Sequence, residues 1–269
     1  MDFIDKEQLY GNKYNALVLC EYTRDLELIK SLINIADEAV EKKKGFDIWS
    51  LEGVCHSFAK TIVDYSKMAY DNLMLGHFDA THMINRSILE NRVCMEIIMD
   101  NEEYELWKYY LAYSYKNEIC NSDEKLTQWH LSKLEEKYKE FEISGDFYVK
   151  QNGRKKPYIK EPYGWTYKIN KHKQFNFAGI CELLDESGER LGFKLMSSYS
   201  HGTSLYKKMQ SSTFVGNMMC MLVSLYIELY IMITSYCWDM VDEEFDEISE
   251  EFETIAHRYI EYEERHFGG

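Results

Sequence analysis

The stretch that decides the fold is His77 to Asp100, HFDATHMINRSILENRVCMEIIMD, which joins helical periodicity to charges placed among apolar residues. At about 100° per residue, the step of an α-helix, Leu89 and Val93 fall on one face. Arg86 and Glu90 fall on the same face, where a core is expected. A charge that faces a core is unfavourable unless it is paired and hydrogen-bonded. The two charges are therefore either a structural clamp or part of a polar site.

A longer polar stripe extends this pair. One helical face carries four polar side chains at steps of three, four and four residues: Asp79, His82, Arg86 and Glu90. Helical bundles build their sites from side chains on facing helices, so this stripe is a candidate lining of a polar pocket. Three polar residues on the opposite face are expected to contact solvent: Asn85, Arg92 and Glu96.

The rest of the chain predicts an all-α fold, a multi-helix bundle with a small irregular or β-hairpin insert near 142–175. The only two prolines, Pro157 and Pro162, lie in that insert, so the other segments are free to form long helices. Asn152-Gly153, a common hairpin-turn dipeptide, separates two strand-like runs. The periodicity predicts helices over 14–43, 51–75, 80–99, 102–120, 122–141, 178–184, 190–198, 213–241 and 243–266.

The whole chain, 1–269, is expected to form one helical domain, with 142–175 as a basic aromatic insert within it. The segment after residue 175 is short for an independent domain, so its helices are expected to complete the bundle that begins at the N-terminus. Ser50 and Asp79 are expected to cap the second and third helices, because their side chains can accept hydrogen bonds from the first backbone N–H groups.

Composition narrows the class of protein. Seven cysteines are widely spaced, without a C-x-x-C pair or zinc-ligand spacing, which predicts reduced thiols in a cytoplasmic protein and no metal. Neither paired E-x-x-H motifs nor a nucleotide-binding glycine loop occurs, so no cofactor is expected. Residues 1–13 lack the apolar core of a signal peptide. The net charge of −15 disfavours generic nucleic-acid binding, since an acidic surface repels phosphates.

Residues 213–241 are the most apolar stretch and are long enough to span a membrane. Glu228 lies near the middle, where an acid costs about 2.5–3.5 kcal/mol on insertion. Asn217, Ser224 and Ser235 share its helical face. Such a polar seam suits a helix buried in a soluble bundle, so we expect no membrane contact and regard Glu228 as a further residue of the polar centre.

The segment Ser197 to Gly202, SSYSHG, is the second candidate site. His201 can transfer protons near neutral pH, and the hydroxyls of Tyr199 and Ser200 precede it. Serine and glycine also end helices, so the same residues suit an ordinary helix terminus.

Two motifs resemble an uncharacterised bacterial all-helical family, whose members carry an R-S-x-x-E helix and a downstream turn with Tyr, Ser and His. They are Arg86-Ser-Ile-Leu-Glu90 and Tyr199-Ser-His-Gly202, and the resemblance covers roughly residues 50 to 240. It implies an all-α fold with Arg86, Glu90 and His201 near one another, and no established activity. Some similar helical proteins belong to ribonuclease and phage-defence groups with an R-x(4–6)-H motif, which is absent here.

The insert is basic and aromatic. Residues 147–177 hold eight lysines and arginines against one acid, with aromatic residues interleaved. This composition suits single-stranded nucleic acid or another phosphorylated ligand, which Arg154, Lys155, Lys156 and Trp165 would bind. The dozen acids between Asp239 and Glu264 offer an alternative, because the insert could dock on them or serve as an arm for a protein partner. We favour these alternatives, since the overall charge is acidic.

Two functions follow, and the sequence leaves open whether the protein is an enzyme. The first is a helical bundle that binds a protein partner or a small ligand in a bacterial stress or phage-defence context, with a homodimer through the seam helices as one form. The second is a hydrolase or nuclease for a phosphate-containing substrate, in which Arg86 stabilises negative charge, His201 is the acid or base, and Glu90 orients one of them. The candidate ligand-binding residues are His82, Tyr199, Ser200, Glu228, Arg154, Lys155, Lys156 and Trp165.

Overall fold

A computed structural model of the protein describes residues 13–75, 77–120, 132, 136, 148–151, 154–157, 162–170, 174–184 and 214–267. Its long helices are α2 (Lys13–Lys42), α3 (Leu51–Met74), α4 (Phe78–Asp100), α5 (Leu106–Cys120), α10 (Phe214–Met232) and α11 (Glu243–Phe267). The shorter elements are η1 (Glu102–Tyr104), β1 (Tyr148–Gln151), β2 (Arg154–Pro157), η3 (Gly164–Thr166), α7 (Phe177–Cys181), η4 (Glu182–Leu184), η5 (Ile233–Cys237) and η6 (Trp238–Met240). The prediction of an all-α bundle is confirmed.

The chain divides into two compact units, each built from separate stretches of sequence. The first unit contains residues 1–44, 58–92 and 191–269, and the second contains 45–57 and 93–190. Most of α3 and α4 therefore belongs to the first unit, together with α2, α10 and α11. The expectation of one domain over 1–269 stays a prediction.

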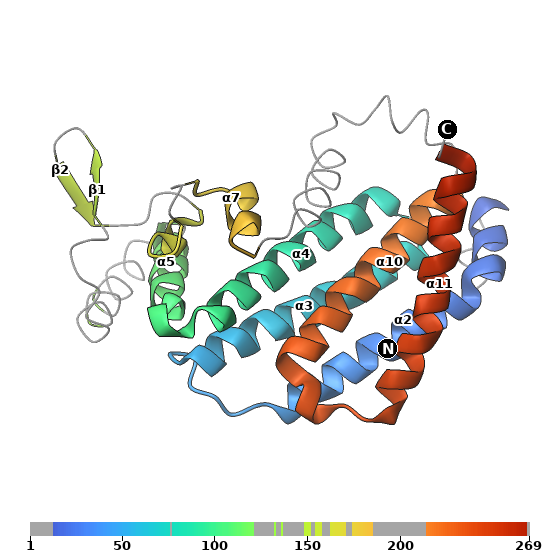
Figure 1. Ribbon diagram of the computed structural model, residues 1–269, viewed down its shortest axis with the longest axis horizontal. Helices are drawn as coiled ribbons and strands as arrows, with labels where there is room; N and C mark the ends of the chain where they lie inside the picture. Colours follow the sequence, from blue (N-terminus) through green and yellow to red (C-terminus); the bar gives the residue numbers. More distant parts are fainter. Residues whose placement is uncertain are drawn as a thin grey trace. The chain divides into compact units, whose positions relative to one another are not determined.

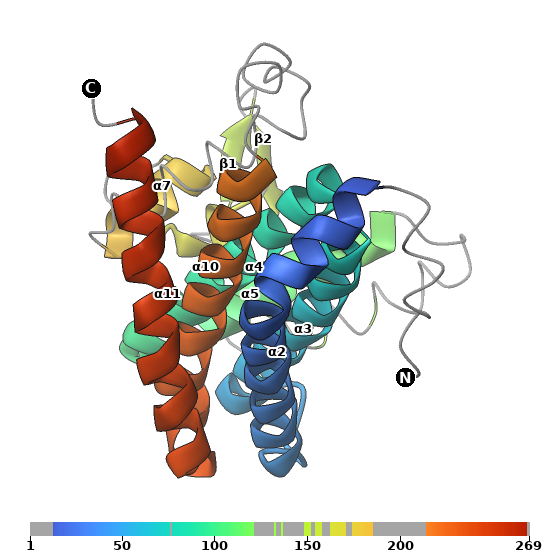
Figure 2. The ribbon, with the colours of Figure 1, turned by 90° about the vertical axis from the view of Figure 1, so that its right-hand side faces the viewer.

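In the first unit, α10 packs against both α2 and α11, and α11 also packs against α2 (Figures 1 and 2). These helices lie at opposite ends of the sequence, so the last helices do complete the bundle begun by the first. Their core is aliphatic and aromatic, with Ile29 and Leu32 of α2, Leu229 of α10 and Phe252 of α11 almost fully buried. Burying each such side chain stabilises the unit by about 1.5–3 kcal/mol.

The C-terminal end of α10 changes its winding. A π-helical turn, η5, follows Met232, and a 3₁₀ turn, η6, follows that. Two lysines at the end of α2 contact η6. Lys43 Nζ lies 2.7 Å from Asp239 Oδ1, and Lys42 Nζ donates to the Met240 carbonyl at 3.3 Å. The lysine run at the end of α2 thus fixes a neighbouring helix as well as suiting its own helix terminus.

Local signals explain where two helices begin. Ser50 Oγ accepts from the Gly53 N–H at 3.0 Å, which confirms Ser50 as the cap of α3. A Cβ atom at Gly53 would overlap the Asp47 carbonyl, so only glycine fits there. The cap predicted for α4 is wrong, because α4 begins at Phe78, before Asp79, and the His77 carbonyl accepts from the Thr81 N–H at 3.0 Å.

The second unit joins α5 to the segment that follows the hairpin. Strands β1 and β2 pair antiparallel, with Tyr148 opposite Pro157, at the place where the sequence predicts a hairpin. The turn η3 packs on α5, and the Trp165 ring lies edge-on to Tyr110, with 5.5 Å between ring centroids. The helices expected over 122–141 and 190–198 lie outside the described residues.

Candidate functional site

The buried face of α4 is only partly the face that the sequence predicts, because Leu89 and Val93 are buried as expected but other expectations fail. Asn85 and Arg92, expected in contact with solvent, are almost fully buried, whereas Arg86 and Glu90 are only partly buried. Met83 of the same helix is 46% exposed. The buried face therefore extends from Leu89 and Val93 toward Asn85 and Arg92, on the side where the sequence predicts contact with solvent. Periodicity could not show this, because the partners of Asn85 and Arg92 lie 136 residues later, on α10.

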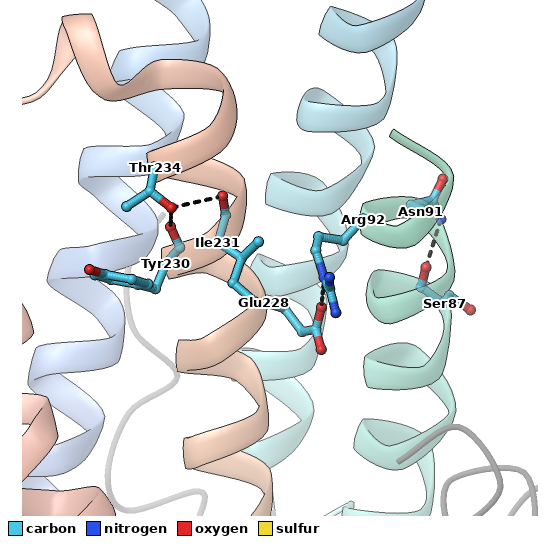
Figure 3. A network of polar contacts seen from close by, with 7 residues as sticks. All are labelled: Ser87, Asn91, Arg92, Glu228, Tyr230, Ile231 and Thr234. Carbon is cyan, nitrogen blue, oxygen red and sulfur yellow. Dashed lines mark hydrogen bonds and ion pairs between the residues drawn. The ribbon is translucent and has the colours of Figure 1, made fainter. Parts of the chain in front are cut away.

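The charge at the centre of the first unit is Arg92. Its Nε atom donates to Glu228 Oε2 at 2.7 Å, and the two side chains are 0% and 7% exposed (Figure 3). Figure 3 shows the pair bridging α4 and α10, while Ser87 and Asn91 lie on another side of α4. Removal of one partner of such a buried pair is strongly destabilising, because the remaining charge then has no compensation.

A second contact lies one heptad earlier on both helices. Asn85 Nδ2 donates to the Met221 carbonyl over a long 3.5 Å. The step from Asn85 to Arg92 equals the step from Met221 to Glu228, so α4 and α10 run in the same direction and in register, as Figure 1 shows. Asn85 Oδ1 is buried and has no hydrogen-bond partner among the described residues. Two polar contacts thus join these helices, and the contact of Arg92 is the shorter one.

The other residues of the predicted polar centre fall into two groups. His82 is buried, on the side of α4 that also carries Asn85. Arg86 and Glu90 lie at the flank of the buried face and are partly exposed. Glu228, predicted to bind a ligand, has its carboxylate on Arg92 instead. Arg92 and Glu228 thus form a buried ion pair between two helices. The two alternatives for Arg86 and Glu90, a structural clamp or part of a polar site, both stay predictions.

The second candidate site, Tyr199, Ser200 and His201, lies outside the described residues. Its proximity to Arg86 and Glu90 stays a prediction, and so do the acid–base role of His201 and the ligand-binding role of the other two residues.

The basic insert is described in part. The backbone of Arg154, Lys155 and Lys156 forms β2, and their role in binding stays a prediction. Trp165 is 1% exposed in the core of the second unit, so no ring face is open to a base, which corrects the ligand-binding role predicted for it. Lys168 is exposed and contacts other residues of the second unit, with Nζ 4.4 Å from the Tyr109 ring centroid and 3.3 Å from the Tyr104 carbonyl.

The titratable groups with the largest shifts are ordinary core residues. Burial raises the pKa of the Cys55 and Cys237 thiols to about 12, and it does the same for the Tyr70 phenol. These thiols are protonated at neutral pH and are poor nucleophiles. Within the described residues, no group of three or more His, Cys, Asp and Glu side chains could hold a metal ion.

One surface of α10, continued into η5, carries mostly apolar side chains that are partly or largely exposed among the described residues. Five residues follow a three–four–three–four spacing along it, and we call them the outer seam: Cys220, Val223, Ile227, Tyr230 and Thr234. Ile227 is 42% exposed and Tyr230 is 37% exposed, and the other three are partly buried. Such spacing is the signature of a helix that packs against another helix. This spacing is visible in the sequence, but it is easily missed when 213–241 is expected to have a single buried face.

The outer seam is fixed on one side by stacked aromatic rings. Tyr226 stacks on Phe252 of α11 with 4.0 Å between centroids, and Tyr230 stacks on Phe245 with 5.6 Å. The Trp238 ring meets Phe245 edge-on at 6.3 Å and is 59% exposed. Aromatic pairs add about 0.5–1.5 kcal/mol beyond burial, so α11 holds this side of α10 rigidly.

An acidic row borders the outer seam. In α11, positions 246, 249 and 253 share one face. That face of α11 adjoins α10, because the Tyr226 hydroxyl donates to the Ser249 carbonyl at 3.5 Å. Burial raises the pKa of Tyr226, and the nearby Glu253 carboxylate adds a smaller increase. Asp246 and Glu253 on this face are exposed, and so is Asp242, which precedes α11 and accepts from the Glu244 N–H at 3.2 Å. We call these three carboxylates the acidic border.

The segment Cys220–Met240 is long and apolar enough to cross a membrane by length and composition. About half of it, 56%, is buried inside the protein, and core helices of soluble proteins pass the same test. The segment is thus weak evidence for a membrane span.

Comparison with known proteins identifies a family. Residues 52–214, more than half of the chain, match a family described as "Family of unknown function (DUF5677)". No curated protein and no solved structure matches the chain. The matched residues include Arg92 and end where α10 begins, so Glu228 and the outer seam follow the matched region.

Proposed function

Since the chain belongs to the DUF5677 family, to which no function is assigned, we propose a function from the geometry alone. We propose that the protein is a binding module, which docks a helical segment of a partner protein on the outer seam of α10. The biological setting we propose is the cytoplasm, in a bacterial stress or phage-defence context.

The observation that carries this proposal is the spacing of exposed apolar residues on a helix that is already buried on its other side. A helix that is apolar all round is normally buried all round. On α10, Met221, Leu225 and Leu229 face the core, while Ile227 and Tyr230 face outward at the same heptad spacing that helices use to pair. A partner helix on the outer seam would bury this second face.

The buried ion pair supports a scaffold role in this proposal. Arg92 and Glu228 are too deeply buried to meet a substrate from solvent, at 0% and 7% exposure. The pair, with Asn85 one heptad away, fixes the rotation of α10 against α4. That rotation decides which α10 residues face outward, and a preorganised surface binds more tightly because less order is lost on binding.

The test uses a defined peptide and two surface variants. The probe is a fluorescent helical peptide of about three heptads, with leucine at the a and d positions and glutamine at the flanking positions. Ile227→Glu places a charge in the outer seam, and Met83→Glu is the matched control, because Met83 is exposed to a similar degree (46% against 42%) on another helix.

We expect the wild type and Met83→Glu to bind the probe alike, as measured by fluorescence anisotropy. Ile227→Glu should weaken binding by about tenfold or more, since it would bury a charge without a partner. The proposal is wrong if the probe does not bind, or if both variants affect binding equally.

A further inference from the structure

The acidic border places negative charge along one edge of the outer seam. We infer that the partner segment is a basic amphipathic helix. Its aliphatic residues would lie on the outer seam, and lysine or arginine on one flank would face Asp242, Asp246 and Glu253. This inference rests on the proposed docking function and adds the chemistry of the partner.

The first argument is that no described lysine or arginine of α11 pairs with the border. Arg258 is the only lysine or arginine among the described side chains of α11, and its Nη2 atom lies 3.1 Å from Asp25 of α2. Asp25 lies on the opposite side of α11 from Ser249, so Arg258 does not neutralise the border. Among the described side chains of α11, none therefore neutralises the border, and its carboxylates can attract a cationic partner.

The second argument is the match between the two surfaces. Tyr226 and Tyr230 of α10 stack on Phe252 and Phe245 of α11, so the apolar seam and the acidic border lie on two helices packed side by side. Helix-in-groove recognition uses apolar anchors at steps of three and four residues. Charged residues at the edge of such an interface add specificity and speed association more than they add affinity.

The charge also argues against a second copy of this chain as the occupant. The chain carries a net charge of −15, and two copies that met through their outer seams would bring their acidic borders toward each other. Like charges placed across an interface suppress that pairing. A basic partner meets the same surface with attraction instead of repulsion.

The experiment compares three probe peptides that share the leucine a and d positions and differ at the flank, which carries lysine, glutamine or glutamate. We expect the lysine probe to bind about tenfold more tightly than the glutamine probe, and the glutamate probe to bind weakest. Raising the ionic strength from about 0.1 M to about 1 M should remove most of the difference, because the Debye length falls from about 10 Å to about 3 Å.

A charge-matched pair of variants separates the border from the overall acidity of the chain. Asp246→Asn with Glu253→Gln should weaken binding of the lysine probe by about three- to tenfold and leave the glutamine probe unchanged. Glu243→Gln with Glu247→Gln removes the same charge from α11, on the side away from Ser249, and should leave both probes unchanged.

Failure of the inference and failure of the proposed function look different. If the three probes bind equally and Ile227→Glu weakens them all, the seam docks a helix and the basic partner is wrong. If no probe binds, both ideas are wrong. If the lysine probe binds only after Arg154, Lys155 and Lys156 are changed to Glu, the chain's own hairpin occupies the outer seam in the wild type and the inferred partner is wrong. A wild-type dimer that Ile227→Glu dissociates, or binding to phosphatidylcholine vesicles, would also overturn the inference.

Discussion

Replacing Glu228 by Gln should be among the most destabilising conservative changes in the first unit. The substitution keeps the shape of the side chain and removes its charge, so Arg92 remains buried with no carboxylate at 2.7 Å. Two unit charges about 4 Å apart interact by about 4 kcal/mol at an effective dielectric constant of 20. Removal of one partner of a buried pair lowers the free energy of unfolding by about 3–5 kcal/mol in other proteins. We expect a loss in that range.

The replacement of both partners tests the reason for this loss. Arg92→Met combined with Glu228→Leu removes both charges and fills a similar volume with apolar atoms. We expect this double variant to lie within about 1–2 kcal/mol of the wild type, or to exceed it, because no buried charge is left. The Lys67–Asp37 pair supplies the control, since its N···O distance is also 2.7 Å but both side chains are 42% exposed. Asp37→Asn should cost at most about 1 kcal/mol.

Urea unfolding followed by far-UV circular dichroism measures the free energies. Because the chain has two compact units, hydrogen exchange of the α10 amides is needed as a second readout that reports on the first unit alone. The reasoning is refuted if Glu228→Gln costs less than about 1 kcal/mol, or if the double variant is as unstable as the single one.

Three further predictions concern packing, backbone geometry and pH. Phe252→Ala should lower the free energy of unfolding by about 3–5 kcal/mol, because the ring is fully buried and stacked on Tyr226. Phe252→Leu should lower it by clearly less, and equal losses in urea unfolding would count against the stacking. Gly53→Ala should lower the free energy of unfolding by about 1–3 kcal/mol, because the new Cβ atom would overlap a backbone carbonyl. Gly45→Ala should lower it by about 1–2 kcal/mol, because the φ of Gly45 is +98°. An unchanged melting temperature in either variant would contradict this geometry. Above pH 9.0, the ordinary pKa of the thiol, unfolded Cys55 and Cys237 ionise, whereas the folded thiols stay protonated up to about pH 12. The unfolded state then binds fewer protons, so the free energy of unfolding should fall by about 1.4 kcal/mol per thiol for each pH unit above 9, and Cys55→Ala should reduce that slope in urea titrations.

The sequence predicts where the helices lie because that information is local. Apolar residues at steps of three and four define α2 from Leu26 to Val40, and Gly45 ends the run with a φ of +98°. The serine before α3 caps it as expected, because an N-cap needs only the next three residues to form. Each of these signals and its effect lie within a few residues of each other.

The choice of the buried face on α4 depends on distant residues, and there the sequence analysis fails. A wheel drawn for this helix places Arg92 with the solvated residues because arginine is usually exposed. Arg92 is buried because Glu228 meets it, and Glu228 is buried because Arg92 meets it. Neither residue alone predicts its burial, and the two lie 136 positions apart. A polar seam was nevertheless visible on α10, where Glu228 shares a face with Ser224 and Ser235.

Ile227 and Glu228 are neighbours in sequence and divide the two roles of α10 between them. Their side chains point about 100° apart, so one faces solvent and the other faces Arg92. If the outer seam is the binding surface and the ion pair is its support, Ile227→Glu should lower probe affinity and leave the free energy of unfolding within about 0.5 kcal/mol of the wild type. Glu228→Gln should instead lower the free energy of unfolding. It should reduce probe binding only in proportion to the loss of folded protein. A variant of Ile227 that unfolds the first unit would show that α10 has no free face, and the binding role would then lose its physical basis.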